Sequence, residues 1–316
     1  MSKTAFLFAG QGAQYIGMGK TLHDNLPACR QTFEEANESL HMNLTGLIFQ
    51  GQKEELDLTE NTQPSVVTTT IAAFRALSEY GIKPDFAAGL SLGEYSALTA
   101  SGVFTLSQVV PLVQKRGRFM QEAVPAGIGK MSAVLGLSAD KVTEACIEAK
   151  DIGIVQPANF NCPGQIVIGG EIKAVDEAAR RCKEKGAMKT IDLPVSAPFH
   201  TSMLKPAAEK LKLELEPMFL GELHTPVICN VNADLINGAD EVKNLLYLQV
   251  MSSVLWEQSI RRMLEEGVTS FVEIGPGKTL SGFVRKIDRG LNIYNVEDMD
   301  SLENTAKALY KTAGRT

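Results

Sequence analysis

The segment that most constrains the fold is Gly89-Leu90-Ser91-Leu92-Gly93, which has the Gly-x-Ser-x-Gly form of a nucleophile elbow. A short apolar run, 86–88, precedes it, and a helical pattern follows over 92–99. A strand, a sharp turn and a helix are the context in which this pattern exposes a serine hydroxyl, and glycines there leave room for neighbouring backbone. The same residues also fit a plain turn between a strand and a helix, so the rest of the chain must decide.

Predicted strands and helices alternate along most of the chain. Strands are expected at 5–9, 86–88, 227–231, 270–274 and 291–296, with helices between them. Such alternation predicts a mostly parallel sheet covered by helices on both faces. One helix is expected to open at 63–64, with Pro64 in its first turn, where the missing N–H costs little.

The pattern changes between 128 and 195. The expected elements are strand 131–136, helix 138–149, strands 154–159 and 165–169, helix 171–185 and strand 188–193. This βαββαβ order is that of the ferredoxin-like unit. We therefore predict an α/β protein with a larger domain formed by 1–127 and 196–316 and a small ferredoxin-like domain, 128–195, inserted into it.

Composition narrows the functional classes. The formal charge of −6 argues against nucleic acid as a partner, and the five scattered cysteines without a Cys-x-x-Cys argue against a disulfide framework or a zinc site. Neither a signal peptide nor a long apolar segment is present in the sequence, so we expect a soluble cytoplasmic protein that does not enter a membrane. No exposed apolar helix stands out, which favours a monomer.

A glycine-rich loop, Gly10-Gln11-Gly12, follows the first strand. The dinucleotide-binding fingerprint fails there, because Tyr15 stands where its third glycine should be. Exposed backbone N–H groups at the end of a strand suit an anion or an oxyanion, although a plain turn between strand and helix fits as well.

A serine nucleophile needs a base, and histidine is the usual one. Of the four histidines, His23 and His41 lie among polar residues in helical segments, and His224 lies in a loop entering a strand. His200 follows 196–199, where the chain returns from the small domain. Loops at such junctions line clefts between domains, so His200 is the favoured base, with a structural role at a helix start as the alternative.

The sequence resembles the malonyl-CoA:acyl carrier protein transacylase family along nearly its whole length. The motifs that carry the resemblance, in order, are Phe8-Ala9-Gly10-Gln11-Gly12-Ala13-Gln14, Gly89-Leu90-Ser91-Leu92-Gly93-Glu94-Tyr95, Arg116-Gly117 with Met120-Gln121, Ala158-Asn159-Phe160-Asn161 with Pro163-Gly164-Gln165-Ile166-Val167, Ala197-Pro198-Phe199-His200-Thr201, Leu248-Gln249-Val250 with Trp256, and Glu273-Ile274-Gly275-Pro276-Gly277-Lys278. The fold that this resemblance implies is an α/β-hydrolase-like core with a ferredoxin-like insertion.

The resemblance implies a role for each site residue. Ser91 is the acylated nucleophile, His200 its base, and the main-chain carbonyl of Gln249 orients the histidine. Backbone N–H groups of Gln11 and Leu92 form the oxyanion hole, each donor typically worth ~10²–10³ in rate. Arg116 holds the malonyl carboxylate, a task that suits a bidentate cation; taken alone, Arg116 also reads as a solvated charge at a helix end.

Departures from the family pattern are few. Leu90 stands where most relatives have His, Cys162 replaces a common Ser, and 252–253 is Ser-Ser instead of a frequent Ser-Pro. None of these removes a catalytic atom, so they bear on acyl selectivity alone. Phe199 resembles the malonyl-type version of its motif.

The activity implied is ping-pong transfer of malonyl from malonyl-CoA to the phosphopantetheine thiol of acyl carrier protein for fatty acid synthesis, with no cofactor and no metal. Acyl carrier proteins are acidic, so docking needs local basic patches on this acidic chain. The candidates, each of which also reads as a solvated helix face, are Arg180, Arg181, Lys183, Lys185 and Lys189 in the insertion, and Arg285, Lys286 and Arg289 in the core.

Three alternatives stay open from sequence. A hydrolase, such as a lipase, esterase or thioesterase, could use the same elbow with water in place of the carrier thiol. A non-catalytic acyl-CoA-binding module is disfavoured by the intact Ser91 and His200 pair. A discrete acyltransferase of a polyketide synthase would share the chemistry and change only the pathway.

Overall fold

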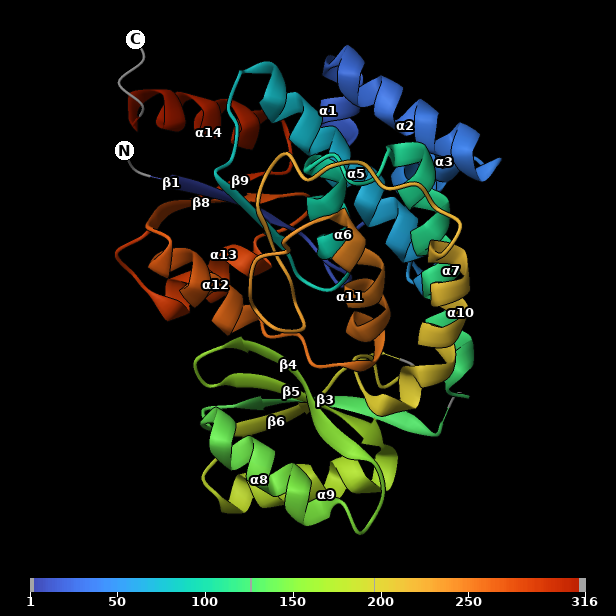
Figure 1. Ribbon diagram of the computed structural model, residues 1–316, viewed down its shortest axis with the longest axis vertical. Helices are drawn as coiled ribbons and strands as arrows, with labels where there is room; N and C mark the ends of the chain where they lie inside the picture. The colour runs from blue at the N-terminus through green and yellow to red at the C-terminus, as the bar shows by residue number, and fades with distance from the viewer. Residues whose placement is uncertain (1–2, 126, 196, 313–316) are drawn as a thin grey trace.

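The computed structural model describes residues 3–125, 127–195 and 197–312; Ala126 and Ser196, close to the predicted domain boundaries, lie outside the described residues. Its strands form a five-stranded and a four-stranded sheet. Figure 1 shows the first sheet with most helices as a large part and the second sheet with two helices below it. We call residues 3–125 and 197–312 the large part and residues 127–195 the small part.

The sheet of the large part is parallel throughout, as predicted, with the order β7-β2-β1-β8-β9. Its strands are β1 (Lys3–Phe8), β2 (Phe86–Gly89), β7 (Val227–Ile228), β8 (Val268–Ile274) and β9 (Asn292–Val296). Because β1, β2 and β7 are parallel neighbours, the segments that follow them leave the sheet at the same carboxyl edge. Ligand sites of such sheets form at this edge.

Helices cover both faces of this sheet. Successive side chains of β1 point to opposite faces. Phe6 and Phe8 therefore share a core with α5 (Thr59–Glu79) and its neighbours, whereas Leu7 packs in a second core with α12 (Trp256–Glu265) and α13 (Thr279–Ile287).

The other helices of the large part range in length from 3 to 18 residues. They are α1 (Lys20–Asn25), α2 (Pro27–Leu40), α3 (Leu44–Gln50), α4 (Lys53–Leu56), α6 (Leu92–Ala100), α7 (Leu106–Ala123), the 3₁₀ helix Ser202–Leu204, α10 (Lys205–Leu215), α11 (Ala239–Met251) and α14 (Met299–Thr312). Within the described ranges, no helix combines the length and apolar character that crossing a bilayer requires.

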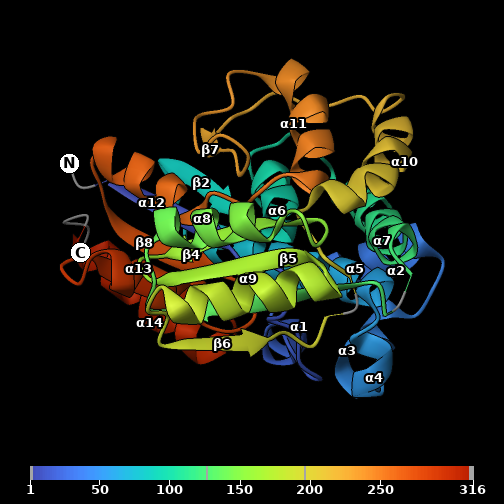
Figure 2. The same ribbon diagram turned by 90° about the horizontal axis from the view of Figure 1, so that it is seen from below.

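The small part has the predicted order of strands and helices. Its elements are β3 (Gly129–Leu135), α8 (Ala139–Ala149), β4 (Val155–Cys162), β5 (Gln165–Glu171), α9 (Ile172–Glu184) and β6 (Lys189–Asp192). The strands are antiparallel in the order β4-β5-β3-β6. One face packs on α8 and α9, which Figure 2 shows on the outside of the sheet, and the opposite face, with Met131 and Val167, joins the core of the large part.

Two sequence predictions were wrong in detail. Helix α5 begins at Thr59, not at 63–64, because the Leu58 carbonyl already accepts the N–H of Thr62. Pro64 therefore lies inside the helix, where its missing N–H removes only the bond to the Glu60 carbonyl. The strand expected at 227–231 pairs only over Val227–Ile228, and the short helices α3 and α4 were not predicted.

Candidate active site

Ser91 occupies a strained turn between β2 and α6. Its φ of 53° and ψ of −103° lie outside the regions that side-chain-bearing residues favour. A Cβ on Gly89 would lie 1.9 Å from the Gly93 carbonyl carbon, and one on Gly93 would lie 2.1 Å from the Phe8 carbonyl oxygen. The strand, turn and helix expected from the sequence are present; Gly89 leaves room for the start of α6, and Gly93 lets α6 approach the end of β1.

The hydroxyl of Ser91 contacts the imidazole of His200. Ser91 Oγ lies 2.7 Å from His200 Nε2, and His200 Nδ1 lies 2.8 Å from the backbone carbonyl oxygen of Gln249. A carbonyl only accepts, so Nδ1 carries the proton and Nε2 is left to accept from the serine. No carboxylate is needed to fix this tautomer.

Burial keeps His200 neutral. The side chain is 4% exposed, and burial, followed by the positive charge of Arg116, lowers its pKa to about 4. The hydrogen bond to the Gln249 carbonyl opposes this shift. An imidazole with this pKa is unprotonated at neutral pH and is therefore ready to accept a proton.

Arg116 is a buried cation beside the serine. It is 1% exposed; its Nη1 donates to Gln63 Oε1 (2.9 Å), and its Nη2 donates to Gln249 Oε1 (3.0 Å) and Ser91 Oγ (3.3 Å). Its guanidinium carbon lies 5.1 Å from the centre of the Tyr95 ring. Among the described residues no carboxylate forms an ion pair with Arg116, so a carboxylate on a ligand would find an uncompensated cation there.

The side chain of Gln249 links that cation to a buried acid. Gln249 Nε2 donates to Glu94 Oε2 (2.7 Å) and to the Ser91 carbonyl (3.0 Å). Glu94 is fully buried, and burial raises its pKa to about 7, against the opposing hydrogen bond from Gln249. Gln249 therefore contacts the histidine through its backbone carbonyl, and the arginine, the elbow and the acid through its side-chain amide.

Backbone donors approach the elbow from two loops. Leu92 is the first residue of α6, so its N–H has no acceptor within the helix. The loop after β1 closes on the elbow, because a Cβ on Gly10 would lie 2.4 Å from the Leu90 carbonyl oxygen. Gln11 lies in this loop, and its side chain accepts from Gln63 Nε2 (3.3 Å).

A cavity of about 740 Å³ opens over Ser91 between the large and small parts. It is lined by Gln11, Leu90, Arg116 and His200 from the large part and by Met131, Asn159, Leu193 and Val195 from the small part. A second cavity, of about 230 Å³, shares Gln11, Leu90 and Asn159 with it and extends to Leu280 and Phe283 on α13. The larger volume lies in the range of sites for small organic ligands.

The structure brings Ser91, His200, Gln249, Arg116 and the Gln11 and Leu92 segments into one site, and leaves the other histidines outside it. Sequence reasoning missed the polar residues Gln63, Glu94 and Asn230, which complete the hydrogen bonding. A signal existed for two of them. Glu94 is a charged residue directly after the elbow motif, and Asn230 is a polar residue near the end of the strand expected at 227–231.

Known proteins share this chain's sequence and fold. Residues 5–303 match the acyl transferase domain family. The chain is 49% identical over 310 residues to a malonyl CoA-acyl carrier protein transacylase of Bacillus subtilis, with 98% of each chain covered, and 42% identical over 288 residues to that of Escherichia coli K12, with 91% and 93% covered.

Solved structures agree with the sequence matches. The crystal structure of a malonyl CoA-acyl carrier protein transacylase from Clostridium perfringens superposes with a TM-score of 0.95 at 46% identity, covering 99% of this chain and 98% of that one. A malonyl-transacylase in complex with a type II PKS acyl-carrier protein has a TM-score of 0.95 at 40% identity, covering 97% of this chain and 100% of that one.

The fold, the serine–histidine pair and the domain match define an acyltransferase. Within that class, the chain belongs to the malonyl CoA-acyl carrier protein transacylase family.

Proposed function

We propose that this protein transfers a malonyl group from malonyl-CoA to the phosphopantetheine thiol of acyl carrier protein, by a ping-pong mechanism through a malonyl ester on Ser91, and so supplies fatty acid synthesis. One observation carries the proposal. Ser91 Oγ lies within hydrogen-bonding distance of both a neutral, buried histidine and a buried arginine that has no carboxylate partner in the described part of the chain.

In the first half-reaction His200 Nε2 takes the proton of Ser91, and Oγ attacks the thioester carbonyl of malonyl-CoA. The C–S bond breaks, and the coenzyme A thiolate leaves with the proton that His200 held. The oxyanion of the intermediate points to the N–H groups of Gln11 and Leu92. The hydrogen bond from His200 Nδ1 to the Gln249 carbonyl (2.8 Å) stabilises the imidazolium that forms transiently.

In the second half-reaction the thiol of the carrier's phosphopantetheine enters the same cavity. His200 takes the thiol proton, the sulfur attacks the malonyl ester, and the C–O bond to Ser91 breaks. The proton then returns to Oγ, so atoms and charge balance without a cofactor.

Arg116 selects for the substrate carboxylate. Its guanidinium is fully buried, and a charge-assisted hydrogen bond is worth about 1.5–3 kcal/mol. An acetyl group would bury the same cation without supplying the carboxylate. Malonyl should therefore be preferred over acetyl by roughly 10–100-fold in the acylation rate constant divided by the dissociation constant.

Intact-mass measurement after exposure to malonyl-, methylmalonyl- or acetyl-CoA tests this proposal, with wild type beside Arg116→Ala. We expect a single, stable malonyl adduct on wild type, a much weaker acetyl adduct, and loss of the preference in Arg116→Ala. Equal labelling by acetyl and malonyl in wild type would refute the role of Arg116. Rapid multiple-turnover release of free malonate would instead indicate a hydrolase, and absence of any adduct that depends on Ser91 would indicate a binding module.

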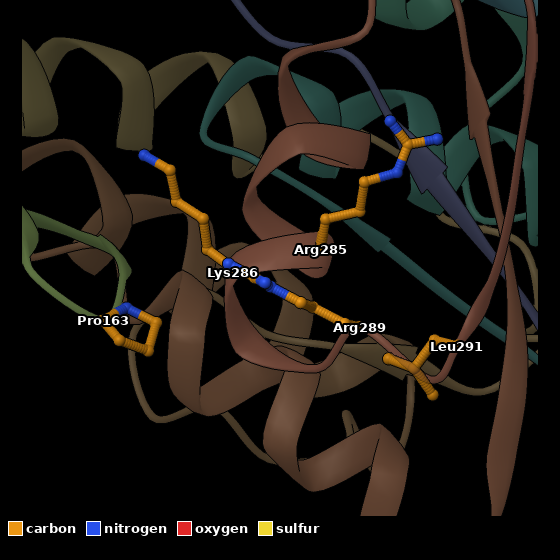
Figure 3. A pocket seen from close by; sticks show the side chains of 5 residues that line it. All are labelled: Pro163, Arg285, Lys286, Arg289 and Leu291. Atoms are coloured by element: carbon orange, nitrogen blue, oxygen red, sulfur yellow. The ribbon is translucent and has the colours of Figure 1, made fainter.

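The carrier protein is proposed to dock beside α13. A surface cavity of about 520 Å³ is lined by Pro163, Arg285, Lys286, Arg289 and Leu291. Figure 3 shows Pro163 facing the helix that carries Arg285 and Lys286. Within the described residues none of the three cations beside α13 forms an ion pair, whereas three of the five in the small-part cluster, Arg180, Arg181 and Lys185, are paired with glutamates. The unpaired cluster can attract an acidic partner, so it is preferred over the cluster in the small part.

Charge reversal separates the two clusters. Arg285→Glu with Arg289→Glu should lower kcat/KM for the carrier protein at low salt about 10-fold or more, while Arg180→Glu with Lys185→Glu should change it little. A parallel measurement of the first half-reaction with malonyl-CoA separates docking of the carrier protein from binding of coenzyme A phosphates. An unchanged kcat/KM for the carrier in the first variant would remove this surface from the proposal.

We further infer that residues 1–127 and 196–316 form an α/β-hydrolase-like domain and residues 128–195 a ferredoxin-like insertion. The parallel order β7-β2-β1-β8-β9 and the antiparallel order β4-β5-β3-β6 support this division. A monomeric state, a cytoplasmic location and the absence of nucleic-acid and membrane partners stay predictions. So does the pathway, since one solved structure of this fold is a malonyl-transacylase in complex with a type II PKS acyl-carrier protein.

A further inference from the structure

The side chain of Asn230 contacts the backbone of the strained serine, Ser91. It follows β7 at the carboxyl edge of the sheet, next to β2, and is fully buried. Its side-chain oxygen accepts the backbone N–H of Ser91 (2.7 Å), and its side-chain nitrogen donates to the backbone carbonyl of Gly89 (2.8 Å). The two bonds bracket the elbow from residue 89 to residue 91.

The backbone of Asn230 is fixed as firmly as its side chain. Its N–H donates to Glu94 Oε2 (3.2 Å), and its carbonyl accepts from the N–H of Leu255 (2.9 Å). The amide therefore has one orientation open to it, because a flip would set its oxygen against the Gly89 carbonyl and its nitrogen against the Ser91 N–H.

We propose that Asn230 is a positioning residue: it holds the backbone of Ser91 in the conformation that aims Oγ at His200 and the Leu92 N–H at the reacting carbonyl. The left-handed φ of Ser91 costs free energy, and such strain persists only where surrounding contacts over-determine it. The partner of the Ser91 N–H and the donor to the Gly89 carbonyl both come from Asn230, outside β2 and α6. Asn230 does not contact the substrate in this scheme, and its effect reaches the reaction through Ser91.

The proposal rests on the proposed acyl transfer, so its test includes a reaction that does not use malonyl-CoA. Asn230→Ala removes both bonds. Asn232→Ala is the matched control, since Asn232 lies in the same loop and, among the described residues, its side chain bonds only to the N–H of the exposed Asp234. Sulfonylation of Ser91 by phenylmethylsulfonyl fluoride, followed by intact mass, reports the reactivity of Oγ alone. Ser91→Ala gives the unlabelled baseline.

We expect Asn230→Ala to lower kcat and the sulfonylation rate about 100-fold each, with KM for malonyl-CoA within about threefold of wild type, because a displaced reacting group costs rate more than binding. Asn232→Ala should match wild type in both assays. A merely structural Asn230 would lower the melting temperature and leave kcat per folded molecule and sulfonylation unchanged, which would overturn the proposal. Failure of malonyl transfer in wild type, with sulfonylation still dependent on Asn230, would refute the acyl transfer and spare the positioning role.

Asn230→Asp tests the same point without removing volume, and so applies even if the alanine variant does not fold. The ionisable neighbours of the new carboxyl group are Glu94 on α6 and Cys229, which precedes it in the chain. When ionised, the carboxylate faces the Gly89 carbonyl and repels it. When protonated, it can donate a hydrogen bond to Gly89 as the amide did. Relative to wild type at each pH, its sulfonylation rate should rise at least about 10-fold as pH falls from 8 to 5, a range in which His200 stays neutral. A ratio that does not change with pH would overturn the proposal.

Discussion

The elbow region and the outer surface of the small part use charge in opposite ways. Around Ser91 the side chains of Arg116 and Glu94 are fully buried and are joined through the neutral amide of Gln249. On α9 both arginines reach solvent and pair directly with glutamates, as Arg180 does with Glu177 and Glu184.

The difference follows from the dielectric environment. In a buried network each polar group depends on its neighbours, and removing one leaves others desolvated without a partner. Exposed pairs exchange their partner for water at little cost. The elbow network is therefore expected to be sensitive to every single change, and the surface of the small part to almost none. The predictions below probe that contrast.

The largest effect is expected from Ser91→Ala. Without Oγ no malonyl ester can form, and the rate of transfer should fall by about 10⁴–10⁶-fold. The measurement is intact mass after malonyl-CoA together with the transfer rate to carrier protein. His200→Ala should lose a similar factor, since the pair acts as a unit. A malonyl adduct that persists in Ser91→Ala would show that another residue is the nucleophile.

Gly93→Ala is expected to cost the most stability. Its Cβ would lie 2.1 Å from the Phe8 carbonyl oxygen, so α6 or β1 must shift, at a cost of about 3 kcal/mol or more in the free energy of unfolding. The control is Gly282→Ala on α13, where a Cβ meets nothing within 4 Å and helix propensity should add about 0.5–1 kcal/mol. Chemical denaturation measures both. Equal stability of the two variants would mean that the elbow is not closely packed.

The same contrast explains what the sequence could and could not predict. Local patterns identified the parallel sheet, the βαββαβ order and the elbow, because period, turn residues and apolar runs are properties of neighbouring residues. Elimination among the four histidines favoured His200, and motif resemblance supplied the role of Gln249. The bonding partners of Gln63 and Asn230 could not be predicted, because Gln63 meets Arg116 across 53 positions of sequence and Asn230 meets Ser91 across 139. Pro64 misled the prediction of α5 because a helix that starts at Thr59 tolerates it.

Glu94→Gln should reveal the buried acid through pH. Burial raises the pKa of Glu94 from 4.5 to about 7, so its stabilising contribution is full below pH 4.5 and is lost as pH rises through 7. Glutamine does not titrate. The free energy of unfolding of wild type, minus that of the variant, should fall by roughly 3 kcal/mol between pH 4.5 and 8.

His200 titrates in both proteins and cancels from this difference, because its lowered pKa is shared. Urea denaturation at several pH values in this range supplies the curve. A difference that stays constant with pH would show that Glu94 ionises normally, and would remove the buried acid from the elbow network.

The smallest effect is expected from Arg180→Ala on α9. Arg180 is 54% exposed and donates to Glu177 and Glu184, yet Glu177 keeps a bond from Arg181, and Glu184, itself 62% exposed, returns to water. The free energy of unfolding, kcat and KM for malonyl-CoA should all equal those of wild type, with and without added salt, because exposed pairs contribute little and are screened. Arg116→Ala, measured alongside, removes the same side chain from the buried network and should lose malonyl preference. If the two arginine variants behaved alike, burial would not be what distinguishes the elbow from the surface of the small part.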